Sequence, residues 1–265
     1  MTELSPNQRK YLRQLRHRKQ FVTAARFFLF VSFFILWETA TRLDWIDSFI
    51  FSSPSRIIAT FTGMASDNRI FLHVGITLLE TLVSFMLVAT LSLLIAILLW
   101  LLPRLSQVLE PYLVILNSLP KSALAPVLIV WLGANIRTII VAAVSVAIFG
   151  AILNLYTAFL EVSPDKIKLI YTLHGTKKEV LFKVILPSTI PATLSIMKVS
   201  IGLCLIGVII GEFISSRWGL GYLIIYGSQV FKLDLVMMSI ILLCIIAMGL
   251  YKLITLLEKL YLKRI

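Results

Sequence analysis

The chain has 265 residues, of which 59% are hydrophobic and only 14% are charged. Soluble globular domains are less than half apolar and about 25% charged, so this composition excludes an ordinary soluble domain and indicates a protein whose solvent is largely lipid. The formal net charge of +12 would suggest nucleic-acid binding in a soluble chain. In membrane proteins basic residues gather on the cytoplasmic side, so we expect membrane lipid, and no nucleic acid, as their partner.

The first 26 residues form a basic arm that leads into an apolar run. Seven Lys and Arg residues lie between positions 9 and 26, and residues 27–37 are uncharged. A signal peptide has the same order, but no small-residue cleavage site follows the run. We therefore expect an uncleaved first membrane span over residues 21–41, with the arm against lipid headgroups. Residues 43–70 are mixed and polar, and SSPSR at 52–56 predicts a turn or an interfacial segment.

Five further apolar segments are long enough to cross about 30 Å of hydrocarbon as helices. They cover residues 81–102, 111–131, 138–160, 188–211 and 235–251. The segment 111–131 is interrupted by Pro120, Lys121 and Pro126, and prolines inside a helix remove backbone donors and cause kinks. The sequence therefore predicts an all-α integral membrane protein with six transmembrane helices.

The distribution of positive charge supports one orientation of these spans. Seventeen of the 25 Lys and Arg residues fall in the segments that an N-inside topology places in the cytoplasm. Six fall in the proposed outside segments and two within spans. Because cytoplasmic loops of membrane proteins carry the excess of Lys and Arg, we expect a multi-pass protein of the cell (inner or plasma) membrane with both termini in the cytoplasm.

The segment 163–187 is the one long polar-mixed stretch in the second half of the chain, and it falls between two predicted spans. Ser163, Pro164 and Asp165 offer an N-cap, a first-turn proline and an acid near the positive end of the helix dipole. The helix that follows is about ten residues long, which is too short to be stable alone in water. It therefore needs a docking surface, and its exposed apolar candidates are Ile167, Ile170, Tyr171 and Leu173.

Further signals divide this loop into two helices. His174 and Gly175 form a stop signal, in which Gly175 can adopt a positive φ. Thr176 and Glu179 have the spacing of a capping box, where the two side chains satisfy each other's free backbone donors. Pro187 is expected to end or bend the second helix just before the next span.

The sequence contains no signature of catalysis or nucleotide hydrolysis. The patterns G-x-x-x-x-G-K-[ST], H-E-x-x-H and G-x-S-x-G are absent from the chain. The three histidines, His17, His73 and His174, lie far apart and have no evident ligand partners in the sequence. We therefore expect no enzyme activity, no cofactor and no metal site.

Several small residues have structural interpretations. The lone G-x-G at 219–221 predicts a re-entrant turn rather than a dinucleotide site, because no helix fingerprint follows it. Gly207 and Gly211 are four residues apart inside a span, a spacing that lets a second helix approach closely. Cys204 and Cys244 lie in apolar runs and are expected to be core residues rather than a disulfide or a metal site.

A few polar residues fall within or beside the predicted spans and are candidates for a translocation path. Lys198 has two open interpretations: it faces a bundle interior or aqueous path, or its side chain extends to the inner interface. Glu80 and Lys121 have the same ambiguity. Asn154 is expected to bridge helices more readily than to bind a ligand. Glu212 is expected at the membrane interface.

In and beyond the loop, the sequence resembles a known family. The family signature reads E-A-A-x-x-x-G and then a variable stretch ending in L-P-x-x-x-P; the matching residues are Thr172, Leu173, Lys183, Val184, Leu186, Pro187 and Pro191. The segments NSLPKSALAPVLIVWLGA at 117–134, GVIIGEF at 207–213 and GLGYLIIYGSQVFKLDLVM at 219–237 extend the match. Over residues 52–258 the chain resembles the permeases of type I ATP-binding-cassette (ABC) importers, in the subgroup for nitrate, sulfonate and taurine-like solutes.

The chain departs from the family pattern inside the loop. Counted back from Pro187, the family's E-A-A falls on Lys168, Leu169 and Ile170, and its glycine falls on His174. A lysine therefore replaces the usual acid. The resemblance implies that the first loop helix docks on a separate ATPase, through Asp165, Ile167, Lys168, Ile170, Tyr171, Leu173, His174, Gly175 and Thr176. It does not imply which charges make that contact.

The resemblance also implies an assembly and a domain organisation. The chain would form the path for a small solute and dimerise with a second permease subunit, identical or different. ABC ATP-binding subunits would supply hydrolysis, and an extracytoplasmic solute-binding protein would deliver substrate. Residues 1–68 would hold the N-terminus, first span and external segment, 69–258 the permease core, and 259–265 a cytoplasmic tail. The alternative is an ion- or solute-coupled secondary transporter, with Lys198, Glu80 and Lys121 as coupling groups.

Overall fold

The computed structural model describes the backbone of residues 6–262. Within these residues, the side chains at positions 6–17, 19, 122 and 262 are not described, so most of the predicted basic arm lies outside the described side chains. Residues 263–265, which are part of the predicted cytoplasmic tail, also lie outside the described residues.

Every regular element within residues 6–262 is a helix, which confirms the predicted all-α class. In chain order the elements are α1 (Pro6–Arg42), α2 (Ser48–Phe51), α3 (Pro54–Ser66), α4 (Arg69–Leu101), α5 (Pro103–Ser118), α6 (Lys121–Leu132), α7 (Ile136–Leu160), α8 (Pro164–Thr172), α9 (Lys177–Val180), the π-helical segment η1 (Leu181–Ile185), α10 (Leu186–Ser215), α11 (Leu220–Gln229) and α12 (Leu233–Leu262).

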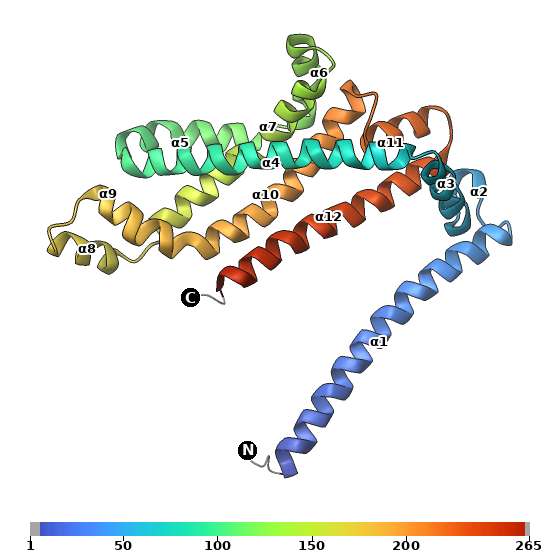
Figure 1. The fold of residues 1–265 in the computed structure, drawn as a ribbon, viewed down its shortest axis with the longest axis horizontal. Helices are drawn as coiled ribbons and strands as arrows, with labels where there is room; N and C mark the ends of the chain where they lie inside the picture. The colour runs from blue at the N-terminus through green and yellow to red at the C-terminus, as the bar shows by residue number, and fades with distance from the viewer. Residues whose placement is uncertain (1–5, 263–265) are drawn as a thin grey trace.

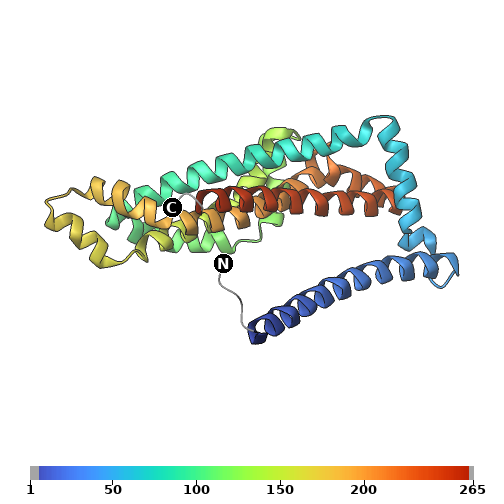
Figure 2. The ribbon, with the colours of Figure 1, turned by 60° about the horizontal axis from the view of Figure 1, so that its bottom comes forward.

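The long helices α4, α7 and α10 pack against one another and form the centre of the molecule, with α5 and α12 alongside (Figure 1). The short helices α8 and α9 lie at one end of this bundle, and α2, α3 and α11 lie at the other. Helix α1 contacts α2 and α3 and diverges from the bundle towards its N-terminus (Figures 1 and 2). The bundle therefore has two separate ends at which polar groups are positioned.

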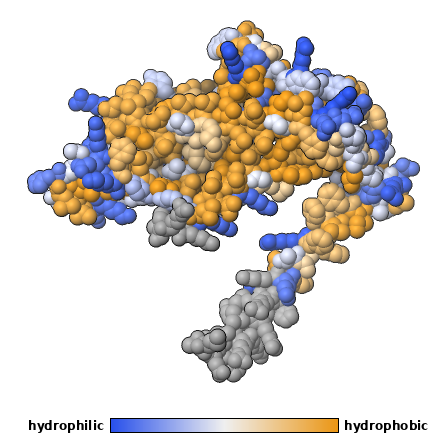
Figure 3. Space-filling model, viewed as in Figure 1, coloured by the Kyte–Doolittle hydropathy of each residue, from blue (hydrophilic) through white to orange (hydrophobic). Residues whose placement is uncertain are grey.

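Five of these helices are long and apolar enough to cross a membrane: Gln20–Arg42, Arg69–Leu101, Ile136–Leu160, Lys177–Ser215 and Leu233–Tyr261. A sixth crossing results if the bent pair formed by α5 and α6 counts as one span. The space-filling view shows a broad apolar surface over the middle of the bundle and hydrophilic residues near its ends (Figure 3). This pattern matches a bundle whose middle lies in hydrocarbon.

The predicted third span is sharply broken. Its two helices are bent by 103° around the Leu119–Pro120 connection. Leu119 has an extended conformation, with φ −62° and ψ 139°, because proline disfavours helical geometry in the residue before it. The two prolines that lie inside helices, Pro111 and Pro126, are accommodated within α5 and α6.

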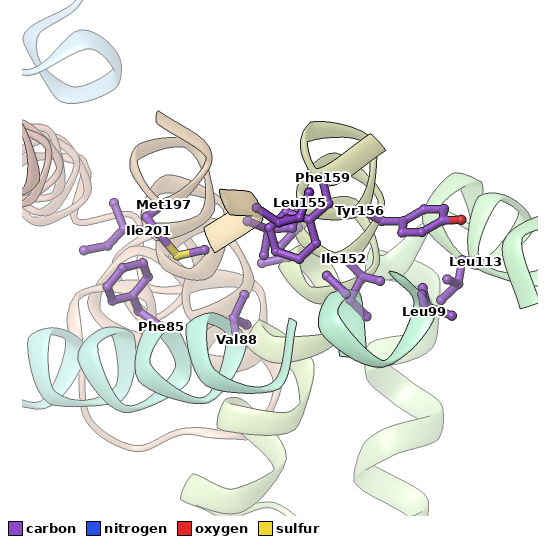
Figure 4. Close-up of a cluster of buried hydrophobic side chains, with 14 of the residues drawn as sticks. Phe85, Val88, Leu99, Leu113, Ile152, Leu155, Tyr156, Phe159, Met197 and Ile201 are labelled. Carbon is purple, nitrogen blue, oxygen red and sulfur yellow. The ribbon is translucent and has the colours of Figure 1, made fainter. Parts of the chain in front are cut away.

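A single large core joins the central helices. Phe85 and Val88 of α4, Leu155 and Phe159 of α7, and Ile201 of α10 belong to one buried cluster, which is shown in Figure 4. Apolar side chains from three helices thus meet along the middle of the bundle and hold its two ends at a fixed separation.

The glycine pair on α10 sits where the sequence predicts a close helix contact. A Cβ added at Gly207 would lie 2.5 Å from Ala143 Cα on α7, and one at Gly211 would lie 2.9 Å from Ile139 Cα. Because these neighbours are backbone atoms, a side chain at either position would push the helices apart. The prediction of a small-residue contact face is confirmed.

Three sequence expectations require correction. The segment 52–56 begins α3, because the Ser53 hydroxyl accepts a hydrogen bond from the Arg56 N–H and Pro54 opens the first turn. Helix α4 begins at Arg69, twelve positions before the predicted start of that span at residue 81. Cys204 is buried as expected, whereas Cys244 is exposed, because it lies on the outward face of α12. Both cysteines are free.

Candidate functional site

The loop between α7 and α10 consists of α8, a tight turn and α9, and it projects from one end of the bundle (Figure 1). Helix α8 begins at Pro164 with Ser163 at its N-cap position, although the Ser163 side chain makes no cap hydrogen bond. Asp165 lies in the first turn, where a negative charge interacts favourably with the helix dipole. The predicted start of the helix is therefore confirmed, and its predicted side-chain cap is absent.

The exposed face of α8 differs in part from the predicted one. Ile167 and Ile170 are half-buried and pack against the core cluster of the bundle. Leu169, Tyr171 and Leu173 are 59%, 48% and 70% exposed. The isoleucines therefore hold α8 on the bundle, and the exposed apolar surface consists of the other three residues.

Helix α8 ends in a Schellman motif centred on His174. The His174 N–H donates to the Tyr171 carbonyl at 3.0 Å, and the Gly175 N–H donates to the Ile170 carbonyl at 2.8 Å. His174 has a φ of +57°, so it occupies the left-handed position that the sequence analysis assigned to Gly175. This assignment was wrong by one residue, because the left-handed position follows directly after the C-cap residue Leu173.

Gly175 has a different role in this turn. A Cβ at Gly175 would lie 2.4 Å from Ile170 Cγ2 and 2.8 Å from Ile170 O. Since a backbone oxygen cannot move aside without breaking the Schellman hydrogen bond, this position requires glycine for the close approach of the chain.

Helix α9 begins with the predicted capping box. The Thr176 hydroxyl accepts from the Glu179 N–H at 3.4 Å, and Glu179 Oε2 accepts from the Thr176 N–H at 2.8 Å. Glu179 Oε1 also pairs with Lys183 Nζ at 2.9 Å, one turn further along the helix. The start of the second helix is thus fixed by side chains that are local in sequence.

The loop is also attached to the end of α4. Lys177 Nζ donates to the carbonyl of Leu101 at 2.6 Å and lies 5.4 Å from the centroid of the Trp100 ring. The free carbonyls at the C-terminal end of a helix favour a cation at this place. A displacement of α9 is therefore transmitted to α4 as well as to α10.

The second loop helix continues into the next span, so the expectation that Pro187 ends it is wrong, whereas the run changes direction where α9 leads into α10 (Figure 1), in agreement with the expected bend. Residues Lys177–Ser215 form one helical run, in which Leu181–Ile185 are widened into a π-helical turn. Pro187 lacks an N–H, and its ring would collide with the carbonyl four residues earlier in a regular helix. The π turn shifts that carbonyl, so α9 and α10 form one mechanical unit.

At the opposite end, polar side chains of α4 bind the turn between α10 and α11. The Gly219 N–H donates to His73 Nδ1 at 3.0 Å, and the Leu220 N–H donates to Thr77 Oγ1 at 2.8 Å. The Thr77 hydroxyl in turn donates to Glu212 Oε1 at 2.7 Å. His73, Thr77 and Glu212 are all buried, so the turn is held by a buried hydrogen-bond network.

The carboxylate of Glu212 fills the space that two glycines leave. The Gly221 N–H donates to Glu212 Oε2 at 2.5 Å. A Cβ at Gly219 would lie 2.2 Å from Glu212 Oε1, one at Gly221 would lie 2.7 Å from Oε2, and Gly219 has a φ of +102°. The prediction that the G-x-G forms a turn is confirmed, and Glu212, which the sequence predicts at the membrane interface, is buried within the bundle. The hydrogen bonds that the Glu212 carboxylate accepts offset the cost of burying its charge inside the bundle.

Of the four polar residues singled out within or near the spans, Glu80 is the one that joins this network. Its side chain is 1% exposed and lies within hydrogen-bonding reach of the Glu212 carboxyl. Residues 73, 77 and 80 share one face of α4, because they are separated by four and three positions. Two features of the sequence could have located the network. One is this polar face of α4, and the other is the stretch EFISSRWGLG at 212–221, which contains Glu212 and the two glycines.

The other three residues have separate surroundings. Lys198 of α10 forms an ion pair with Glu258 of α12, and Lys121 donates to the carbonyl of Asn117 beside the break between α5 and α6. Asn154 is exposed on α7. Among the residues that the structure describes, no group of His, Cys, Asp and Glu side chains is arranged to hold a metal ion.

A cavity of about 550 Å³ lies beside the network, between α3, α4, α11 and α12. His73 and Tyr222 form part of its wall and stack with an interplanar angle of 7°, and Tyr226 stacks on Tyr222 at 21°. Arg69 and Lys232 line it together with Asp67 and Asp234, so the lining carries charges of both signs. The volume falls in the range of small-molecule sites, and the cavity shares His73 with the buried network.

The comparisons with known proteins agree with this architecture. Residues 88–265 match the family model described as the binding-protein-dependent transport system inner membrane component. The chain belongs to this family. It is a permease component of ABC transport systems, as the resemblance in the loop and the terminal segments predicts.

Individual relatives of the permease are similar over most of their length. An ABC transporter permease protein of Haemophilus influenzae is 29% identical over 82% of this chain and 88% of its own. The formylaminopyrimidine transport permease ThiX of Halalkalibacterium halodurans is 26% identical over 73% of this chain and 76% of its own. The taurine permease of Escherichia coli is 22% identical over 80% of this chain and 79% of its own. The predicted subgroup is therefore confirmed.

The fold of the permease is also found among solved structures. The MetNI methionine ABC transporter, in an inward-facing conformation, contains a chain with a TM-score of 0.62 and 18% identity. The match covers 72% of the permease and 96% of that chain. At this identity the likeness establishes the fold alone, and it confirms the type I importer architecture.

Proposed function

We propose that this permease forms the transmembrane path for a small solute in an importer at the cell membrane, with both termini in the cytoplasm. In this proposal the path is completed by a second permease subunit, identical or different. ABC ATP-binding subunits dock on the loop of α8 and α9, and an extracytoplasmic solute-binding protein delivers substrate to the opposite end. The permease supplies the path and its partners supply ATP hydrolysis.

The observation that carries the docking proposal is the exposed apolar surface of α8. Leu169, Tyr171 and Leu173 are exposed at an end of the bundle where hydrophilic residues also gather (Figure 3). Adjacent apolar side chains at such a place favour contact with another protein. Asp165 and Lys168 flank them and are also exposed, so the docking surface combines an apolar centre with charges at its edge.

The connections of this loop explain how docking can drive transport. Helix α8 packs on the bundle through Ile167 and Ile170, and α9 continues through η1 into the full length of α10. The far end of α10 carries Glu212, which holds the turn to α11. Movement of the loop by an ATPase would therefore reach the opposite end of the permease through one continuous helix.

The substrate class proposed for the permease is a small organic or inorganic solute of the kind that its relatives carry. Those relatives include permeases for taurine, nitrate and a formylaminopyrimidine. The cavity of about 550 Å³ between α3, α4, α11 and α12 has room for such molecules. Its stacked rings favour planar solutes.

The test is the double variant Tyr171→Ala with Leu173→Ala, in the permease co-expressed with its ATPase and binding protein. We expect normal insertion, with loss of ATPase co-purification and of solute uptake in vesicles. The matched control is Tyr251→Ala with Leu253→Ala on α12, which removes the same two residue types at the same spacing and similar exposure. Equal uptake and equal ATPase capture by both double variants would contradict the docking proposal.

A second arm separates the proposal from secondary transport. The purified permease is reconstituted alone and supplied with a proton or sodium gradient, without ATP. We expect no solute uptake under these conditions and restoration of uptake when the ATPase, the binding protein and ATP are added. Gradient-driven uptake by the permease alone would favour the secondary transporter instead.

A further inference from the structure

Glu80 and Glu212 are two acidic side chains that meet inside the bundle. Glu80 lies eleven residues after Arg69, so it is about 16 Å from the start of α4. Glu80 is 1% exposed and Glu212 is 0% exposed. Two carboxylates in contact repel each other strongly where water is excluded. Such a pair is stable only if a cation or a proton compensates one of the charges.

The hydrogen-bond partners of the two side chains are very unequal. Glu212 accepts from the Thr77 hydroxyl and from the Gly221 N–H. Glu80 Oε2 is buried, and no donor reaches it among the described residues. A carboxylate that receives two donors is stabilised in its ionised form, whereas a buried carboxylate without donors is unstable. Glu212 is therefore the residue of the pair that carries the negative charge.

No basic side chain offsets the second charge. The ion pairs among the described side chains include neither Glu80 nor Glu212. The remaining titratable groups that face the network are His73 on α4, whose Nδ1 lies 3.0 Å from both the nitrogen and the carbonyl oxygen of Gly219, and Tyr222 on α11, whose ring stacks on His73.

The packed neighbours contribute no free cation either. On α7, Arg137 is exposed, and in the turn before α11, Arg217 is exposed. On α12, Asp234 is paired with Arg56. Ser84, one turn beyond Glu80 on α4, is buried, and its hydroxyl has no partner among the described residues. A hydroxyl brings no charge, so compensation by a proton remains the arrangement that these groups support.

We propose that Glu80 and Glu212 form a binding site for one proton. Glu80 carries the proton and donates it to the Glu212 carboxylate, which also holds the Gly219–Gly221 turn. The proton thus completes the attachment of this turn to α4. Loss of the proton leaves two adjacent negative charges and weakens that attachment. This site lies in the permease itself and does not depend on the proposed docking of the ATPase.

Infrared spectroscopy of the intact permease in lipid nanodiscs tests the protonation state directly. The difference spectrum between the wild type and Glu80→Gln at neutral pH should contain the C=O band of a protonated carboxyl. The control is Glu110→Gln, which replaces an exposed glutamate on α5 and should show carboxylate bands only. Carboxylate bands in the Glu80→Gln difference spectrum would overturn the proposal.

Thermal unfolding provides a second, independent measurement. A proton held in the folded state stabilises the protein below the pH at which it dissociates, and this stabilisation is lost as the pH rises. We expect the Tm of the wild type to fall at alkaline pH. The Tm of Glu80→Gln should not show this loss, because its amide still donates to Glu212. The proposal fails if both proteins have the same pH profile.

Thermal unfolding also tests whether a metal cation, rather than a proton, occupies the site between the two carboxyl groups. The wild-type Tm at neutral pH should be the same in sodium and in choline salts of equal ionic strength. A Tm that rises with sodium in the wild type and not in Glu80→Gln would show that both carboxyls are ionised around a bound cation, and would overturn the proton site.

Discussion

Lys198 on α10 and Glu258 on α12 form an ion pair that is largely enclosed between the two helices. Their side chains are 14% and 18% exposed, respectively. The sequence left open whether Lys198 faces a path or extends to the interface. In this structure the charge of Lys198 is compensated by Glu258, which lies 60 positions later in the chain. The pair therefore joins the C-terminal half of α12 to the middle of α10.

A double-mutant cycle on this pair has a definite expected pattern. Lys198→Met or Glu258→Leu alone should lower the free energy of unfolding by about 2 kcal/mol, because each leaves one charge partly enclosed without a partner. The double variant Lys198→Met with Glu258→Leu should recover most of that loss. The measurement is thermal unfolding of the purified permease in detergent. Strict additivity of the two single effects would show that the side chains do not interact.

The turn after α8 gives a second prediction, in which two neighbouring substitutions have opposite effects. His174→Gly should stabilise the end of α8 by about 1 kcal/mol, since His174 has a φ of +57° that glycine adopts without strain. Gly175→Ala should destabilise it by about 1–3 kcal/mol, because its Cβ would contact the Ile170 carbonyl. Amide hydrogen exchange of residues 170–176 measures both. Equal protection in the two variants would contradict this description of the turn.

The contact between α10 and α7 gives a third prediction. Gly207→Ala should lower stability by about 1–3 kcal/mol, because the new Cβ would lie 2.5 Å from Ala143 Cα. Gly202→Ala is the matched control on the same helix, since nothing lies within 4 Å of its Cβ position. That control should be neutral or stabilising by about 0.5–1 kcal/mol. The comparison uses the Tm of both variants in the same detergent, and similar destabilisation by both would refute the close contact.

The features that the sequence predicts correctly depend on residues close together in the chain. The capping box of Thr176 and Glu179 and the first-turn proline of α8 are local, and the spans follow from the length of apolar runs. The shift from Gly175 to His174 at the left-handed position does not follow from local signals alone. The position of that residue depends on where the helix ends, and this end is set by the packing of Ile167 and Ile170 on the bundle.

The features that sequence reasoning misses depend on contacts between distant residues. Glu212 is buried because Thr77, 135 positions earlier, donates to it, and because backbone donors of the 219–221 turn face it. Nothing near Glu212 in the chain indicates that Thr77 is its partner. Likewise, the partner of Lys198 lies on α12, and the exposure of Cys244 depends on which face of α12 meets the bundle. Hydropathy predicts that all these residues lie in spans, but it does not predict which face of its helix each residue occupies.

The segment that contains α2 and α3 gives a last prediction, because one acid joins it to α12. Asp234 Oδ1 accepts from the buried Ser52 hydroxyl at 2.7 Å, and Oδ2 accepts from Arg56 Nε and Nη2 at 3.1 and 2.8 Å. Asp234→Ala should lower stability by about 1–2 kcal/mol, since it removes the acceptor of a buried hydroxyl and a bidentate pair. The control Asp67→Ala breaks an exposed pair with Arg69 at 3.8 Å and should be nearly neutral. Hydrogen exchange should rise over residues 48–66 in Asp234→Ala alone; a rise of equal size in both variants, or in neither, would show that Asp234 does not hold α2 and α3 to α12.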